Sequence, residues 1–319
     1  MDVSVIVPTT YQHPGFLLDA LASVKAQKLP CHDFEILVVD NAPRTTRDLI
    51  ALCNPNGRPP VRYIHEPRRG LHNARHAGAR AARGYILVYI DDDALAPPGW
   101  LGAILEPYND QKVACVGGRT LPLYEREPPE WLSRFHGYLS LLDRGDQIRE
   151  LRWPEDIYGC NFSIHKSILF KVGGFHPDGF AESDLLWYRG DGETGLLRKV
   201  YLAGYKVVYT PHGWLHHRVP ANRMTVEYLS QRAFREGFSK GFTEYREKQH
   251  PRWRLLLRAV PFFLSWQYKT VMGTLVPGQL RRARYRVSAS FCRSRALYGW
   301  RLAMSDSLRK YVTRETFLD

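Results

Sequence analysis

Hydrophobic and polar positions follow two alternating periods over roughly the first third of the chain. Short β-branched runs predict buried strands at residues 3–7, 35–40, 61–65 and 85–90. Amphipathic stretches between them predict helices at residues 16–27 and 71–83. Strands that alternate with helices are typical of βαβ units, so the pattern predicts an α/β fold with a mostly parallel central sheet.

The helix predicted at residues 71–83 carries mainly small residues on one face. The positions at three- and four-residue spacing are Leu71, Ala74, Ala77, Gly78 and Ala81. Such a face lets a helix approach a sheet closely. We expect the arginines of this helix, Arg75, Arg80 and Arg83, to point away from that contact.

The regular pattern is lost between residues 118 and 158, where prolines and tryptophans accumulate, and we expect a long irregular excursion of the kind that often covers a substrate. Order returns with a helix predicted at 193–202, which Gly204 ends, and a strand at 206–209. After residue 217 the composition shifts to Arg, Leu and aromatic residues. We therefore expect a catalytic domain at 1–217 and a mainly helical region at 218–319.

Charge is unevenly distributed along the 319 residues, whose formal net charge is +13. Residues 218–319 contain 21 Lys and Arg against 7 Asp and Glu, which leaves the first 217 residues close to neutral. This basic region predicts either a polyanionic partner, such as an anionic membrane surface or a nucleic acid, or simply a solvated basic face. No nucleic-acid-binding signature accompanies it, so a nucleic acid is the less favoured partner.

The five cysteines lie far apart, without a CxxC pair or a histidine at zinc-ligand spacing. The N-terminal apolar run is too short for a signal peptide. These features argue against a disulfide framework, a zinc site and export. They favour a reduced, cytoplasmic location.

Carboxylates follow two of the predicted strands directly. Asp91, Asp92 and Asp93 come after the strand at 85–90, and Asp40 ends the strand at 35–40. In an open α/β sheet this edge is where ligands bind, and clustered carboxylates suit Mg²⁺ or Mn²⁺. Asp40 is placed to accept hydrogen bonds from a nucleotide. An acidic turn that caps the next helix is the simpler alternative.

The ordered set of motifs resembles family 2 glycosyltransferases, inverting enzymes with the GT-A fold. The resemblance spans about residues 3–217 and rests on VSVIVPTT, EILVVDNA, RRGLHNARHAGARAARG, YILVYIDDDALAPPGWL, GCNFSIHKSILFKVGGF and GDGETGLLRKVYLAGYKVVYTP. It implies a Rossmann-like three-layer sandwich with a mostly parallel sheet, and a nucleotide-diphosphate sugar as donor.

The resemblance also implies site residues. The residues expected on the donor side are Pro8, Thr9, Asp40, Arg69, Asp91 and Asp92. Asp93, with Asp91 and His217, is expected to bind Mn²⁺ or Mg²⁺. The histidine pair at 216–217 could equally be surface or packing residues.

An inverting transfer needs a base that deprotonates the acceptor hydroxyl. Alignment of the helix at 193–202 with the family places Gly192 and Glu193 where a Glu-Asp pair usually stands. Glu193 is therefore the expected base and Asp191 the substitute, whereas an acid that only stabilises a helix N-terminus is the alternative. On the acceptor side the resemblance suggests Asn161. Trp187 and Tyr188 could stack on a sugar, although aromatic residues are more often core.

Residues 259–280 form a run of 22 residues whose only charge is Lys269, with arginines on both sides. Pro261, Pro277 and the lysine argue against a spanning helix, and interfacial attachment to an anionic membrane fits better. Packing against the catalytic domain is the alternative.

Together these observations predict a metal-dependent inverting glycosyltransferase that transfers a sugar to a hydroxyl acceptor, which could be lipid-linked, in polysaccharide, glycolipid or other glycoconjugate synthesis. We expect it to be peripheral on the inner face of the cytoplasmic membrane. Two alternative functions are possible. A sugar-nucleotide nucleotidyltransferase would need a phosphate-binding loop, which residues 7–15 do not supply. An inactive GT-A scaffold or binding subunit is the other alternative.

Overall fold

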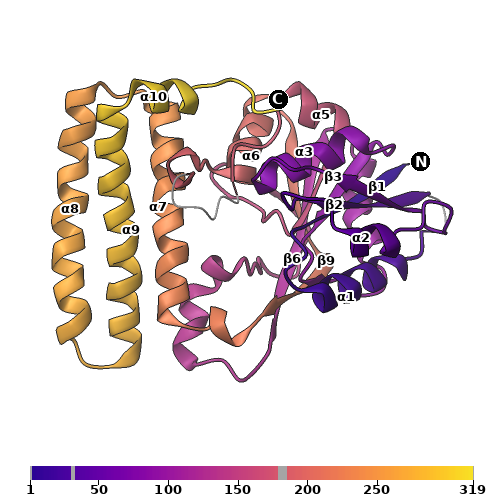
Figure 1. The fold of residues 1–319 in the computed structure, drawn as a ribbon, viewed down its shortest axis with the longest axis horizontal. Helices are drawn as coiled ribbons and strands as arrows, with labels where there is room; N and C mark the ends of the chain where they lie inside the picture. The colour runs from indigo at the N-terminus through magenta and orange to yellow at the C-terminus, as the bar shows by residue number, and fades with distance from the viewer. Residues whose placement is uncertain (1, 30–32, 179–184, 319) are drawn as a thin grey trace.

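A computed structural model describes residues 2–29, 33–178 and 185–318 of the chain. One nine-stranded sheet forms its centre, with the order β3-β2-β1-β4-β8-β6-β9-β5 and with β7 paired to β9 (Figure 1). The strands are β1 Val3–Thr9, β2 Phe34–Asp40, β3 Val61–His65, β4 Ile86–Ile90, β5 Ala94–Leu95, β6 Val113–Tyr124, β7 Arg149–Leu151, β8 Asn161–His165 and β9 Lys206–Val219. Strands β1 to β4 pair in parallel, as do β6 and β9, so the predicted mostly parallel sheet is confirmed.

The sheet separates two hydrophobic clusters, because successive residues of a strand face opposite sides. Val5 and Val7 of β1 face one cluster and Ile6 faces the other. The helices packed against the sheet or beside it are α1 Pro14–Lys25, α2 Arg47–Leu52, α3 Leu71–Ala81, α4 Trp100–Leu105, α5 Lys166–Lys171 and α6 Gly192–Leu202. The three-layer arrangement expected from the sequence is therefore present.

The small-residue face of α3 packs against the sheet as predicted. A Cβ added at Gly78 would lie 2.5 Å from Ile6 Cγ2, so only glycine allows this approach. Arg75 contradicts the expectation, because it is buried on the same helix and points toward the edge of the sheet that carries the acidic residues. It lies four residues after Leu71 and therefore shares its face.

The segment 118–158 is more regular than predicted. Strand β6 continues to Tyr124, 3-10 helix η2 spans Glu130–Leu139, and β7 adds a strand. Strand β9 also extends well beyond the predicted residues 206–209. In its second half His212, His216 and Arg218 lie on the more exposed side, whereas Leu215, His217 and Val219 alternate with them on the buried side.

The 3-10 helix η4 Ala221–Arg223 and four α-helices follow β9 and form the mainly helical C-terminal region (Figure 1). The α-helices are α7 Val226–Lys248, α8 Arg252–Leu275, α9 Gln279–Met304 and α10 Asp306–Val312. Helix α9 lies between α7 and α8, so α8 forms one end of the molecule. No described helix has the length and apolar content needed to cross a membrane.

Candidate active site

The predicted ligand edge of the sheet opens into two neighbouring cavities. The smaller, about 280 Å³, is lined by Pro8, Thr9 and the three aspartates after β4, with His217 and Arg223. The larger, about 590 Å³, is lined by Asp178, Asp191 and Glu193, among others. Asp91 lines both. The strand-end acids and the predicted base therefore face connected space.

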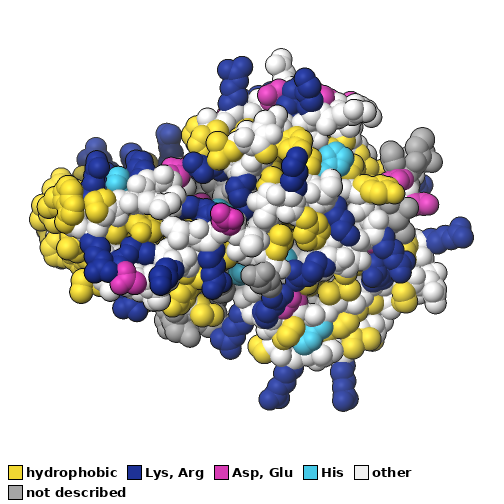
Figure 2. All heavy atoms as spheres, turned by 90° about the horizontal axis from the view of Figure 1, so that it is seen from above, with side chains coloured by type: hydrophobic (Ala, Val, Ile, Leu, Met, Phe, Trp, Pro, Cys, Tyr) yellow, Lys and Arg dark blue, Asp and Glu magenta, His cyan; other side chains and the backbone are white. Residues whose placement is uncertain are grey.

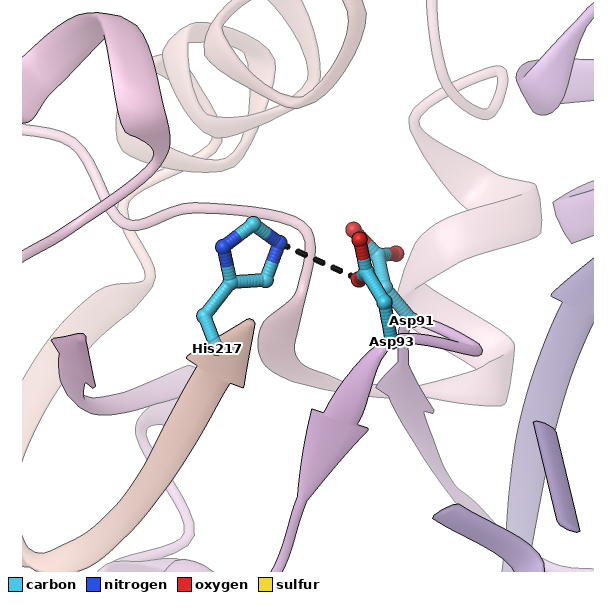
Figure 3. A group of neighbouring side chains, drawn as sticks. All are labelled: Asp91, Asp93 and His217. Carbon is cyan, nitrogen blue, oxygen red and sulfur yellow. Dashed lines mark ion pairs between the residues drawn. The ribbon is translucent and has the colours of Figure 1, made fainter. Parts of the chain in front are cut away.

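Asp91 and Asp93, from the turn after β4, converge with His217 of β9 on one point (Figure 3). One ligand atom from each lies within 4.8 Å of the others. Asp93 Oδ1 is 3.2 Å from His217 Nε2, and Asp93 Oδ2 is 2.9 Å from Arg223 Nη1. Carboxylate oxygens with one imidazole make a donor set that fits Mn²⁺ or Mg²⁺.

Charge pairing separates the acidities of Asp92 and Asp93. Burial would raise the pKa of Asp93, but His217 and Arg223 outweigh it and hold that pKa well below its usual value. Burial raises the pKa of Asp92 to about 7, against the hydrogen bond that Thr9 Oγ1 donates to its Oδ2 at 2.5 Å. Asp93 is thus the better ligand for a cation, while Asp92 ties β1 to the end of β4.

Glu193, at the start of α6, is held at both carboxylate oxygens. Its Oε1 accepts a hydrogen bond of 3.0 Å from the Gly159 amide, and its Oε2 lies 3.4 Å from Arg75 Nη1. The side chain keeps 22% exposure on the cavity side. It is therefore fixed in orientation yet open to a bound molecule.

Arg75 connects the predicted base with the metal-ligating acids. Its guanidinium lies 3.2 Å from Asp178, 3.4 Å from Glu193 and 4.0 Å from Asp91. A Cβ added at Gly159 would meet Arg75 Nη2 at 2.1 Å, so glycine is required beside it. Burial raises the pKa of Asp178 to about 6 despite the opposing charge of Arg75. One buried cation thus lies within 4.0 Å of three carboxylates.

Asp191 is the residue predicted from the sequence as the alternative base. Both of its carboxylate oxygens contact other side chains. His176 Nδ1 lies 2.6 Å from its Oδ1, and Thr243 Oγ1 donates to its Oδ2 at 2.5 Å. Burial would raise the pKa of Asp191, but His176 and Thr243 lower it below its usual value. Its carboxylate joins α6 to α7 rather than facing a substrate freely.

Comparison with known proteins identifies the family of the chain. Residues 4–173, more than half of the chain, match the family described as glycosyl transferase family 2. The chain belongs to this family. It is therefore a glycosyltransferase, as the resemblance implied.

Named relatives of this family 2 enzyme include the succinoglycan biosynthesis protein ExoM of Rhizobium meliloti (strain 1021), 26% identical over 88% of this chain and 87% of ExoM. A glucosyl-dolichyl phosphate glucuronosyltransferase of Haloferax volcanii is 26% identical over 56% of this chain and 58% of its own length.

Solved structures show the same GT-A fold. The mannosyltransferase PcManGT of Pyrobaculum calidifontis, in complex with GDP-Man and Mn²⁺, has a TM-score of 0.53 at 17% identity, covering 95% of this chain and 72% of that one. TarS 1–349 of S. aureus, in complex with UDP-GlcNAc, has a TM-score of 0.52 at 13% identity, covering 93% and 91%. At these identities the likeness shows the fold alone.

Several predicted site residues of this glycosyltransferase lie elsewhere. Asn161 is buried and binds Trp100 Nε1, the Arg119 carbonyl and the Gly213 carbonyl, so it holds the sheet together. Trp187 packs edge-on against Phe238 and Tyr188 against Tyr311. None of these three predicted acceptor residues is among the described linings of the two cavities, so their role on the acceptor side stays a prediction.

Two predicted donor residues also differ from expectation. The Asp40 carboxylate is buried and accepts from the Ala42 and Thr46 amides and from Tyr63 Oη. It shapes the loop after β2 instead of facing the cavity. Arg69 lies in the exposed loop before α3, outside the described cavity linings.

Three residues of the site were missed from the sequence: Arg75, Asp178 and Arg223. Only Arg75 left a signal, its place on the buried face of α3. Asp178 lies in the loop after α5 and Arg223 at the end of the 3-10 helix η4 Ala221–Arg223, and both reach the site through the tertiary fold.

Proposed function

We propose that this glycosyltransferase moves a sugar, with inversion, from a nucleoside diphosphate donor to a hydroxyl acceptor, and that it depends on Mn²⁺ or Mg²⁺. The observation that carries the proposal is the chain of contacts from His217 and Asp93 to Asp91, and through Arg75 to Glu193. It joins a cation-binding corner to a carboxylate that is open to the larger cavity.

In the reaction the acceptor oxygen attacks the anomeric carbon, whose bond to the diphosphate oxygen breaks with its electron pair leaving on the diphosphate. Glu193 accepts the hydroxyl proton, since its fixed carboxylate faces the cavity. Asp91, Asp93 and His217 would hold the metal, which supplies positive charge opposite the leaving diphosphate. Thr9 and Asp92 border the same pocket and position the donor.

The two parts of the chain, residues 1–217 and 218–319, are proposed to have different functions. We assign catalysis to residues 1–217 and association with a surface or acceptor to residues 218–319, although β9 continues to Val219. The two parts share the site, because Thr243 of α7 binds Asp191 and Arg223 binds Asp93.

Helix α8 supports a peripheral position on an anionic membrane, at the inner face of the cytoplasmic membrane. Its exposed apolar residues recur at helical spacing and are Trp253, Leu256, Leu257, Val260, Leu264, Tyr268, Val271 and Leu275. After Arg258 the only charged residue of α8 is Lys269, and its Nζ donates to Ser288 Oγ at 2.7 Å, toward α9. We name this uncharged outward side the α8 face. Figure 2 shows hydrophobic side chains gathered at that end of the molecule, with Lys and Arg beside them.

Titration calorimetry tests the catalytic proposal. UDP, GDP, dTDP and CDP are each titrated once with Mn²⁺ present and once with EDTA present. We expect one nucleotide to bind in the presence of the metal and to lose this binding in Asp93→Ala. Asp110→Ala, which removes an exposed carboxylate before β6, is the matched control and should bind normally.

The corresponding nucleotide sugar should then release its diphosphate slowly, with water as the acceptor. Absence of binding by all four nucleotides would overturn the proposal and favour an inactive scaffold. Release of inorganic pyrophosphate from a nucleoside triphosphate and a sugar phosphate would instead identify a nucleotidyltransferase.

A further inference from the structure

Basic side chains gather on one part of the larger cavity. They come from η2, from the segment before α6 and from α7, and we name them the cationic wall: Arg134, Arg189, Arg232, Arg235 and Lys240. Glu236 lies among them, and Lys240 Nζ is 3.5 Å from it. The acids around Arg75 line the same cavity.

Among the described residues, no ion pair links Arg189, Arg232 or Arg235 to a carboxylate, although Asp178 and Glu236 act on Arg189 from beyond ion-pair distance. Arg232 Nε donates to the Tyr138 carbonyl at 3.1 Å, whereas Arg189 Nε is buried without a hydrogen-bond partner. A buried donor without a partner costs stability, and a ligand that accepts a hydrogen bond from Arg189 Nε would offset that cost.

Mutual repulsion among these arginines contributes to the lowered pKa values of Arg189 and Arg235. Burial and then the charge of Arg232 lower the pKa of Arg189, although Asp178 and Glu236 act in the opposite direction. Burial and the charge of Arg232 also lower the pKa of Arg235. An anion bound between the three side chains would remove this repulsion.

The position of the cationic wall in the larger cavity indicates that an anion bound there belongs to the acceptor. Arg189 and Arg235 line the larger cavity with Glu193, and neither lines the smaller one with the metal-ligating residues. Arg232 reaches both cavities. The diphosphate of the donor belongs beside the metal in the smaller cavity, so a second anionic group fits the molecule that carries the attacking hydroxyl.

We infer that the cationic wall binds a phosphoryl group of the acceptor, so that the acceptor is a phosphate or diphosphate ester with a free hydroxyl. This inference rests on the proposed function. Guanidinium groups bind phosphate oxygens in pairs, and the several charges of a phosphate or diphosphate offset several arginines better than one carboxylate does. The ester could be lipid-linked or a soluble sugar phosphate, since both present the same chemistry to the wall.

Calorimetry in EDTA separates this site from the metal corner. The probes are geranyl diphosphate for a lipid-linked ester, glucose 1-phosphate for a soluble one and glucuronate for a carboxylate. We expect one of the two phosphate esters to bind, and Arg189→Ala or Arg235→Ala to weaken that binding at least about tenfold, as loss of a charged hydrogen bond does. Arg254→Ala, an equal charge loss on α8, should change nothing, and Arg235→Lys should retain part of the affinity.

Binding of glucuronate as tight as that of the phosphates would overturn the inference, as would phosphate binding that is lost in Asp93→Ala but not in Arg235→Ala. No binding of either phosphate ester to the wild type would also overturn it. Nucleotide titrations with Mn²⁺ on the same samples distinguish a failure of the proposed function from a failure of the phosphate-ester inference. Failure of the proposed function removes nucleotide binding, whereas failure of this inference leaves it intact in every arginine variant.

Discussion

Arg75 sets the electrostatic balance of the site at the scale of single residues. It faces Asp178, Glu193 and Asp91 from a buried position and stacks over the Phe175 ring at 5.2 Å. Because removing one partner of a buried ion pair leaves uncompensated charge, this residue supports both the fold and the orientation of the base.

Arg75→Gln should therefore lower turnover by about ten- to a hundredfold and the free energy of unfolding by about 3–5 kcal/mol, the usual cost of breaking a buried ion pair. Urea unfolding and the release of nucleoside diphosphate measure the two effects. Arg80→Gln, one turn later in the same helix and more exposed, is the control and should retain both properties. Near-normal turnover in Arg75→Gln would show that Glu193 does not need this contact.

Glu193→Gln separates chemistry from binding. Because the amide cannot accept the hydroxyl proton, turnover should fall by about 10²–10⁴-fold while nucleotide affinity in Mn²⁺ changes little. Loss of nucleotide affinity instead would make Glu193 part of the donor site.

Asp191→Asn is the comparison variant, since Asp191 binds His176 and Thr243. We expect its main effect on the urea midpoint. A larger loss of turnover in Asp191→Asn than in Glu193→Gln, with unchanged stability, would make Asp191 the base.

At the scale of elements, periodicity predicted most of what supports the site. The strand that ends just before Asp91 and the helix that begins beside Glu193 followed from local pattern, as did the small-residue face of α3. The second half of strand β9 and the contacts of Asn161 did not. Their partners lie far away in sequence, and the second half of β9 pairs with β5 and with the bulged end of β6.

Helix α3 also gives the fold a dependence on acid. Burial lowers the pKa of His72 to about 4 and that of His76 to about 2, and His76 Nε2 accepts the Phe175 amide hydrogen at 2.8 Å. Both histidines are thus neutral in the folded chain. The unfolded chain, with a histidine pKa of about 6.5, binds more protons below that pH.

The free energy of unfolding should therefore fall as the pH drops from 6.5 toward 4.5, by about 2–3 kcal/mol for His76 alone. Urea titrations at several pH values measure the slope, and His76→Gln should flatten it. His212→Gln, at an exposed position on β9, should leave the slope unchanged. An equal slope in His76→Gln and the wild type would show that His76 titrates normally in the fold.

At the scale of the whole molecule, charge and apolar surface divide as the sequence predicted. The basic C-terminal region supplies Arg232, Arg235 and Lys240 of the cationic wall and the α8 face at the far end. Net charge revealed this region, but not that Lys269 turns inward and leaves the α8 face uncharged, because that depends on the pairing of α8 with α9. A bilayer would receive the α8 face while arginines at its ends contact anionic headgroups.

Leu257→Asp combined with Leu264→Asp should abolish flotation with phosphatidylcholine vesicles that contain phosphatidylglycerol, because both side chains are more than half exposed on the α8 face. Wild-type binding should weaken in pure phosphatidylcholine and at high salt, since the arginine contribution is screened. Leu202→Asp, at an equally exposed leucine on α6, should float like the wild type. If the double variant instead still floats but loses a concentration-dependent dimer in light scattering, the α8 face contacts a second copy of the chain and the membrane assignment is wrong.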